Sequence, residues 1–185
     1  MPKLSMFNSV SLDGYFTDLK NDMSWAHQRD PEWDEFVAGN ATGKGRLLFG
    51  RVTYQMMEGF WTSPQAAQMM PDVAKGMNAS AKVVFSRTLD KVGWDNTVLL
   101  KGNLVAEVKK LKADSGPDMV ILGSGSIVAQ LAQENLIDEY QIVVSPVAIG
   151  GGRTLFEGLK KTLRLKLVKT RAFKNGSVFS VYHPA

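Results

Sequence analysis

Glycines and polar residues directly follow three short apolar segments of the chain, and they are of the types that bind phosphate. These residues are Gly50, Arg51 and Thr53 after residues 46–49, Ser86 and Arg87 after residues 82–85, and Gly123, Ser124, Gly125 and Ser126 after residues 119–122. Glycines let an anion approach the backbone, helix N-termini present free N–H groups, and arginine pairs with phosphate through two N–H groups. The three segments therefore indicate a ligand with several phosphates, which favours a nucleotide cofactor.

The segment MVILGSGSIVAQL carries the most specific of the three signals, because an apolar run leads through glycines into a helical pattern. A helix N-terminus attracts negative charge, and Ser124 and Ser126 can add hydroxyl donors. The dinucleotide fingerprint G-x-G-x-x-G is incomplete, since Val128 stands where the third glycine belongs. An ordinary turn between a strand and a helix, with a serine N-cap, is the alternative interpretation.

The other two segments also allow a simpler interpretation. Arg51 and Thr53 suit a phosphate contact, but they equally suit a capped helix with a solvated arginine. Ser86 and Arg87 suit the 2′-phosphate that distinguishes NADP from NAD, and the alternative is a pair of surface residues.

Two further sets of residues are candidates for contacts with a substrate or for proton transfer. The run Gly150-Gly151-Gly152-Arg153 allows a close backbone approach to a ligand, although a tight turn alone explains it as well. The acidic residues that follow the first strand are candidates for a general acid, although acidic side chains also simply favour helix N-termini. They are Asp30, Glu32, Asp34 and Glu35.

Two segments resemble other functional motifs, and both interpretations are rejected. GNATGKGR at residues 39–46 looks like a phosphate-binding P-loop, but its spacing before Gly43-Lys44 is one residue short and Gly45 replaces the required Ser or Thr. Alternating leucines and basic residues at 163–167 suggest a nucleic-acid face, but lysines on a strand also discourage edge pairing. We therefore expect neither an NTPase nor a nucleic-acid partner.

The composition narrows the possible chemistry. The chain of 185 residues has no cysteine and two histidines, so it can form neither a disulfide nor a multi-histidine metal site, and we expect no metal. Its net charge of +4 suits anionic small molecules. No apolar run approaches the roughly 18 residues of a membrane span, and the N-terminus lacks a signal-peptide pattern. We expect a cytoplasmic protein without a membrane partner.

The residues above need a scaffold, and apolar patterning predicts one. Strands are predicted at 3–9, 46–49, 82–85, 97–100, 118–122, 139–144, 163–173 and 178–182, and helices at 31–42, 53–58, 104–112 and 126–135. Residues 59–80 are predicted as a loop, a helix and a loop. Asn175-Gly176 predicts a hairpin between the last two strands. Alternating strands and helices favour one α/β domain over residues 1–185, with a mostly parallel sheet, helices on both faces and a C-terminal antiparallel hairpin.

Four segments together resemble the dihydrofolate reductase-like superfamily over nearly the whole chain. They are FNSVSLDGY, LLFGRVTYQMM, KVVFSRTL and VILGSGSIVAQLAQENLIDEYQIVVSPVAIGGGRTLF. The resemblance is closest to the RibD C-terminal-like branch, the reductase domain of bacterial riboflavin biosynthesis. It implies a three-layer α/β/α fold around a mixed sheet, with NADPH bound across the strand ends. Proteins of this branch are often dimers, which implies a homodimer here.

The resemblance also implies an activity and a set of site residues. The activity is hydride transfer from NADPH to a small heterocyclic or ribosylamino substrate, as in 5-amino-6-(5-phosphoribosylamino)uracil reductase. Dihydrofolate or pterin reduction and a non-catalytic NADP-binding module are the alternatives. No single carboxylate after Trp25 matches the acid of folate-reducing relatives. By position, Gly50, Arg51 and Thr53 would hold phosphates, Ser86 and Arg87 the 2′-phosphate, Gly123 to Ile127 the pyrophosphate, Ser9 and the loop from Asp13 to Phe16 would lie near the nicotinamide, and Asp13 and Arg153 would serve the substrate.

Overall fold

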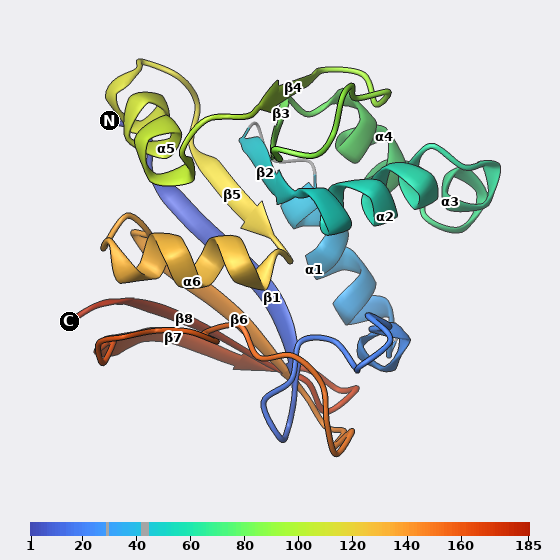
Figure 1. Cartoon of the computed structure of the whole chain (residues 1–185). Coiled ribbons are helices and arrows are strands. Elements are labelled where there is room, and N and C mark those ends of the chain that lie inside the picture. The colour runs from blue at the N-terminus through green and yellow to red at the C-terminus, as the bar shows by residue number, and fades with distance from the viewer. Residues whose placement is uncertain (29, 42–44) are drawn as a thin grey trace.

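The computed structural model describes residues 1–28, 30–41 and 45–185 (Figure 1). The P-loop-like residues Gly43 and Lys44 lie outside the described residues. The strands are β1 Leu4–Ser11, β2 Arg46–Gly50, β3 Lys82–Phe85, β4 Thr97–Leu100, β5 Met119–Leu122, β6 Glu139–Ser145, β7 Leu165–Ala172 and β8 Val178–Pro184. The helices are the 3₁₀ turn η1 Ser24–Ala26 and the α-helices α1 Pro31–Ala41, α2 Arg51–Trp61, α3 Pro64–Met69, α4 Pro71–Ala79, α5 Leu104–Ala113 and α6 Gly125–Gln133.

All of these strands join one sheet in the order β4-β3-β2-β5-β1-β6-β8-β7. The pairs from β4 to β6 are parallel, and β8 pairs antiparallel with both β6 and β7. The predicted α/β class, with a mostly parallel sheet and a C-terminal antiparallel hairpin, is confirmed. Because parallel strands point the same way, the carboxyl ends of β2, β3, β4 and β5 all lie on the same side of the molecule.

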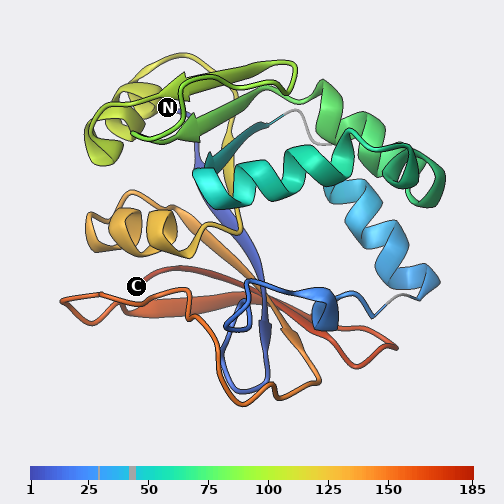
Figure 2. The ribbon, with the colours of Figure 1, turned by 45° about the vertical axis from the view of Figure 1, so that its right-hand side comes forward.

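Helices cover both faces of the sheet, as Figures 1 and 2 show, with α5 and α6 on one side and α1 to α4 on the other. Val108 of α5 and Leu131 of α6 belong to a core that includes Met6 and Ile121 of the sheet. Tyr54 of α2 and the α4 side chains Val73 and Met77 pack against β2 and β3 on the opposite face, and Trp33 of α1 packs against the hairpin strands. Since each face buries its own apolar cluster, the fold has three layers.

The prediction for residues 59–80 is wrong. Helix α2 continues to Trp61, and two further helices, α3 and α4, follow it. Pro64 and Pro71 each occupy the start of a helix, where proline's missing N–H group costs no hydrogen bond. The Ser63 hydroxyl accepts a hydrogen bond from the backbone N–H of Ala66 and caps α3. The prolines therefore begin helices where the sequence suggested loops.

No helix in the described part of the chain is long and apolar enough to span a membrane.

Candidate functional site

A cavity of about 520 Å³ lies at the carboxyl ends of β2, β3, β4 and β5, beside the first residues of α2, α5 and α6. In Figure 1, β2 leads directly into α2, and β5 leads into α6, near the middle of the molecule. The cavity brings together most of the residues that the sequence singled out. Those that line it are Gly50, Arg51, Thr53, Ser86, Arg87, Ser124, Gly125, Ser126, Ile127 and Arg153.

The remaining sequence candidates are not among the lining residues. They include Ser9, Asp13, Gly123, Gly150, Gly151, Gly152, Asp30, Glu32, Asp34 and Glu35. Gly123 has a structural role next to the cavity. Its φ of +60° and its close contact with α2 both require glycine. A Cβ at this position would lie 2.9 Å from Cγ2 of Thr53. Gly123 therefore lets the β5–α6 turn pack directly against the start of α2.

Hydrogen bonds from Ser124 join the two glycine-containing junctions. Its buried hydroxyl accepts from the backbone N–H of Gly50 at 2.9 Å and donates to the carbonyl of Leu122 at 3.2 Å. Its own backbone N–H donates to Oγ1 of Thr53 at 3.1 Å. Ser124 occupies the N-cap position of α6, but its side chain makes no capping bond. The hydroxyls of Ser124 and Thr53 thus hold the β2–α2 and β5–α6 junctions together.

Three helix N-termini face this cavity. The first residues of α2 and α6 line it, as do the Gly102-Asn103 turn and the first two residues of α5. Asn103 caps α5 by accepting a hydrogen bond from the backbone N–H of Ala106 at 3.0 Å. This third junction was not predicted as part of the site, although Gly102-Asn103 after strand 97–100 carries the signal of an N-cap. Because each N-terminus has free N–H groups and a partial positive charge, the cavity favours an anion.

Arginine side chains add full positive charge to this cavity. Arg51, Arg87 and Arg153 are exposed, and Arg51 donates to Oε1 of Gln55 at 3.2 Å. Neither Arg87 nor Arg153 forms an ion pair with another described residue. The Ser86 hydroxyl accepts hydrogen bonds from the backbone N–H groups of two residues just beyond Arg87, at 3.2 and 3.1 Å. Ser86 therefore shapes the turn that presents Arg87, and its own oxygen is already engaged.

Asp13 fastens the loop after β1 to the glycine-rich segment at 149–152. Its carboxylate accepts hydrogen bonds from the Ser11 hydroxyl at 2.6 Å and from the backbone N–H groups of Ile149 and Gly150 at 3.2 and 2.7 Å. The Ser11 hydroxyl bond, followed by the Gly150 N–H bond, lowers the pKa of Asp13 below its ordinary value. Its carboxylate is thus ionised and holds two loops together.

The acidic residues near α1 also have structural partners. Asp30 accepts hydrogen bonds from the backbone N–H of Trp33 at 3.0 Å and from that of Asn175 at 3.1 Å. Glu32 forms a 2.6 Å ion pair with Arg171 of β7. These contacts cap α1 and attach it to the β7–β8 hairpin, away from the cavity.

The β1 side of the cavity contains Phe16, the last residue of the loop expected near the nicotinamide, together with Thr17 and Asn21, for which no motif gave a signal. The Phe16 ring lies so close to Gly125 that an added Cβ would be 2.7 Å from it. Apolar side chains, among them Met56 and Phe85, also contribute to the wall. The cavity therefore combines a rim of arginines and helix N-termini with an apolar wall.

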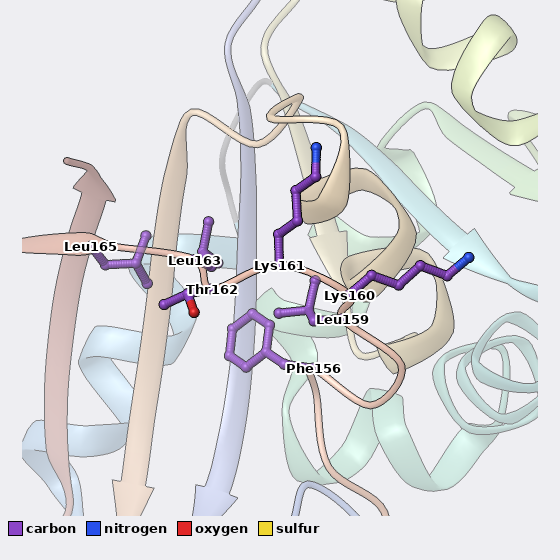
Figure 3. A pocket seen from close by; sticks show the side chains of 7 residues that line it. All are labelled: Phe156, Leu159, Lys160, Lys161, Thr162, Leu163 and Leu165. Carbon is purple, nitrogen blue, oxygen red and sulfur yellow. The ribbon is translucent and has the colours of Figure 1, made fainter.

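A second hollow of about 450 Å³ lies elsewhere on the molecule and shares no lining residue with the first. Figure 3 shows its apolar residues, with the ammonium groups of Lys160 and Lys161 pointing away from the Phe156 ring. None of the residues expected to contact a cofactor or substrate lines it.

The fold and the cavity define an α/β protein of the dihydrofolate reductase-like class, in which ligands bind at the carboxyl ends of the strands. A solved structure described as a putative riboflavin biosynthesis protein from Shewanella sp. PV-4 superimposes with a TM-score of 0.76, at 25% identity over 99% of both chains. The Thermotoga maritima diaminohydroxyphosphoribosylaminopyrimidine deaminase/5-amino-6-(5-phosphoribosylamino)uracil reductase has the same fold, with a TM-score of 0.71 and 13% identity over 100% of this chain and 57% of that one.

The family model of the RibD C-terminal domain matches residues 2–179, and the chain belongs to this family. The uncharacterized protein YyaP of Bacillus subtilis is 28% identical over 177 residues, which cover 95% of this chain and 91% of YyaP. The uncharacterized protein YwjB of the same organism is 24% identical over 171 residues, which cover 92% of each chain.

Proposed function

We propose that this protein is an NADPH-dependent reductase that transfers hydride to a small heterocyclic or ribosylamino substrate. The observation that carries the proposal is the convergence of three helix N-termini and three arginines on one cavity with apolar walls. Membership of the RibD C-terminal domain family supports it, as does the likeness to a putative riboflavin biosynthesis protein.

The residues of the cavity fit the parts of such a dinucleotide. Backbone N–H groups at the starts of α2 and α6 would bind the central phosphates, and Arg51 would lie beside them. Arg87 would pair with the 2′-phosphate, because its guanidinium is free of other described ion pairs. When bound, NADPH supplies the hydride. The chain's own contribution is to orient the two rings and to exclude water from the space between them.

The residues that line the cavity limit which group can give the reduced product its proton. They include no Asp, Glu, His, Lys or Tyr among the described residues, and the carboxylates of Asp13, Asp30 and Glu32 are engaged elsewhere. We infer that the product takes its proton from water. Arg153, at the β1 side of the cavity, would bind an anionic group of the substrate.

The test begins with the binding of NADPH and NADH, followed by NADPH consumption with pyrimidines, pterins and quinones. We expect tighter binding of NADPH and consumption with at least one class of acceptor. Binding without any consumption would favour a non-catalytic NADP-binding module, and the absence of NADPH binding would overturn the proposal.

The Arg87→Ala variant tests the assigned recognition of the 2′-phosphate. Loss of a charge-assisted bond of about 1.5–3 kcal/mol should weaken NADPH binding by roughly 10-fold to 100-fold while NADH binding changes little. Arg164→Ala, an exposed arginine that lines neither hollow, is the matched control. Equal losses of NADPH and NADH affinity in Arg87→Ala would contradict the assignment.

A further inference from the structure

Thr17 carries a buried hydroxyl without a hydrogen-bond partner. Within the described ranges, three buried polar side-chain atoms lack a partner, namely Thr17 Oγ1, Trp25 Nε1 and Tyr140 Oη. Of these three residues, Thr17 lines the 520 Å³ cavity, and its exposed fraction is 8%. A buried polar group without a partner is costly in a native structure, so a bound ligand that pairs with it offers an explanation.

The backbone around Thr17 is held firmly in place. The backbone N–H of Arg153 donates to the Thr17 carbonyl at 3.0 Å, and the N–H of Phe16 donates to the Arg153 carbonyl at 2.9 Å. Gly152 lies against the same Thr17 carbonyl, where any Cβ would collide with it. The Phe16 ring in turn rests on Gly125, the first residue of α6. These contacts fix the Thr17 backbone at the cavity wall before any ligand arrives.

Thr17 lies away from the arginine assigned to the 2′-phosphate. Phe16 touches the start of α6, which follows β5, whereas Arg87 follows β3. Strand β2 lies between β5 and β3, so two strand spacings, about 10 Å, separate the two places. The start of α2, which follows β2, lies between these two places, and the start of α6 lies beside Phe16. Thr17 is therefore placed to contact the end of the ligand that carries the reacting ring.

We propose that Thr17 Oγ1 hydrogen-bonds the amide group of a ring bound at this end of the cavity, and that Thr17 is a specificity-determining residue. This inference rests on the proposed function. A hydroxyl both donates and accepts, which matches the N–H and C=O groups of an amide. Two sources share this chemistry: the carboxamide of nicotinamide and the cyclic amide of a pyrimidine or pterin.

The test compares Thr17→Val, which keeps the shape and removes the hydroxyl, with Thr17→Ser, which keeps the hydroxyl. NADPH and adenosine 2′,5′-bisphosphate, which lacks nicotinamide, are titrated into each protein. Uracil and pterin are then titrated into each protein saturated with NADP⁺. The melting temperature of each unliganded protein is measured in parallel.

We expect Thr17→Val to bind one ring about fivefold to tenfold more weakly, the size of one lost hydrogen bond, while Thr17→Ser changes little. A loss for NADPH but not for the bisphosphate would identify the nicotinamide carboxamide. A loss confined to uracil or pterin would identify the substrate amide. The melting temperature of Thr17→Val should stay equal or rise, because the substitution removes an unpaired buried group.

Unchanged binding of every ring by Thr17→Val would overturn the inference about Thr17, as would a lower melting temperature with unchanged binding, which marks a structural role. Failure of the unaltered protein to bind NADPH is a separate result, and it would overturn the proposed function itself.

Discussion

Lys82 is the first residue of β3 and lies at the end of this strand that is remote from the cavity. Its side chain is buried, and the residue is 1% exposed. Its ammonium donates to the carbonyls of Asn78, Ser80 and Asp95 at 3.1, 2.6 and 3.1 Å, and it lies 4.4 Å from the Trp94 ring centre. Burial disfavours the charged form and lowers the pKa of Lys82 from 10.5 to about 8. Lys82 therefore joins α4 to the β3–β4 loop at an electrostatic cost.

This shift of the pKa predicts a pH dependence of stability. Between pH 8 and 10.5 the folded protein releases the Lys82 proton while the unfolded chain keeps it, so the unfolded state binds more protons. The free energy of unfolding should then rise with pH, by on the order of 3 kcal/mol across this window. Denaturant unfolding of the unaltered protein and of Lys82→Met at both ends of the window measures the difference, and the variant removes the contribution of other titrating groups. A difference that does not change with pH would contradict this prediction.

At the scale of the elements, the cavity depends on how closely the loop after β1 approaches α6. A Cβ on Gly125 would lie 2.7 and 2.8 Å from two atoms of the buried Phe16 ring. We expect Gly125→Ala to lower the free energy of unfolding by about 1–3 kcal/mol through overpacking, and to weaken NADPH binding.

The matched control for Gly125→Ala is Gly59→Ala on the exposed side of α2. No atom lies within 4 Å of a Cβ at Gly59, so alanine should stabilise the helix by roughly 0.5–1 kcal/mol. Thermal and denaturant unfolding of the two variants should therefore shift in opposite directions. A stabilising effect of Gly125→Ala would show that Phe16 can move aside.

At the scale of the whole molecule, the sheet has two free edges, β4 and β7. Residues 166–172 of β7 are all exposed and include Lys166 and Lys169, and lysines on an edge strand resist pairing with another chain. The homodimer implied by the resemblance remains a proposal, and β7 is poorly suited to be its interface. We expect light scattering or sedimentation to give twice the mass of one chain, and that mass should persist in Lys169→Glu. A monomer would contradict the proposal.

Local patterns predicted much of this arrangement. The strands at 82–85 and 97–100 were predicted with their observed bounds, and the β7–β8 turn contains the predicted Asn175-Gly176, with Gly176 at a φ of +85°. Most of the candidate residues that directly follow β2, β3 and β5 line one cavity, because neighbouring parallel strands end on the same side of the sheet. Residues 59–80 were mispredicted because proline starts a helix as readily as it ends one, and spacing alone does not distinguish the two.

The roles of individual side chains were harder to predict, because they depend on partners far away in the chain. Ser124 looked like a helix cap, yet its hydroxyl pairs with Gly50, 74 residues away. Asp30 looked like a possible acid, yet it accepts from Asn175, 145 residues away. Thr17 carries no motif, and the role proposed for it depends on a buried hydroxyl without a partner in a residue of the cavity wall.

Periodicity, glycine placement and composition were thus sufficient for the fold class and for the β2–α2 and β5–α6 junctions, because backbone geometry and apolar burial act over a few neighbouring residues. Folding decided which hydroxyls are occupied, which carboxylates are engaged and which group is left unpaired in the cavity. These properties depend on hydrogen bonds across strands and loops, and such bonds form only once the sheet has brought distant segments together.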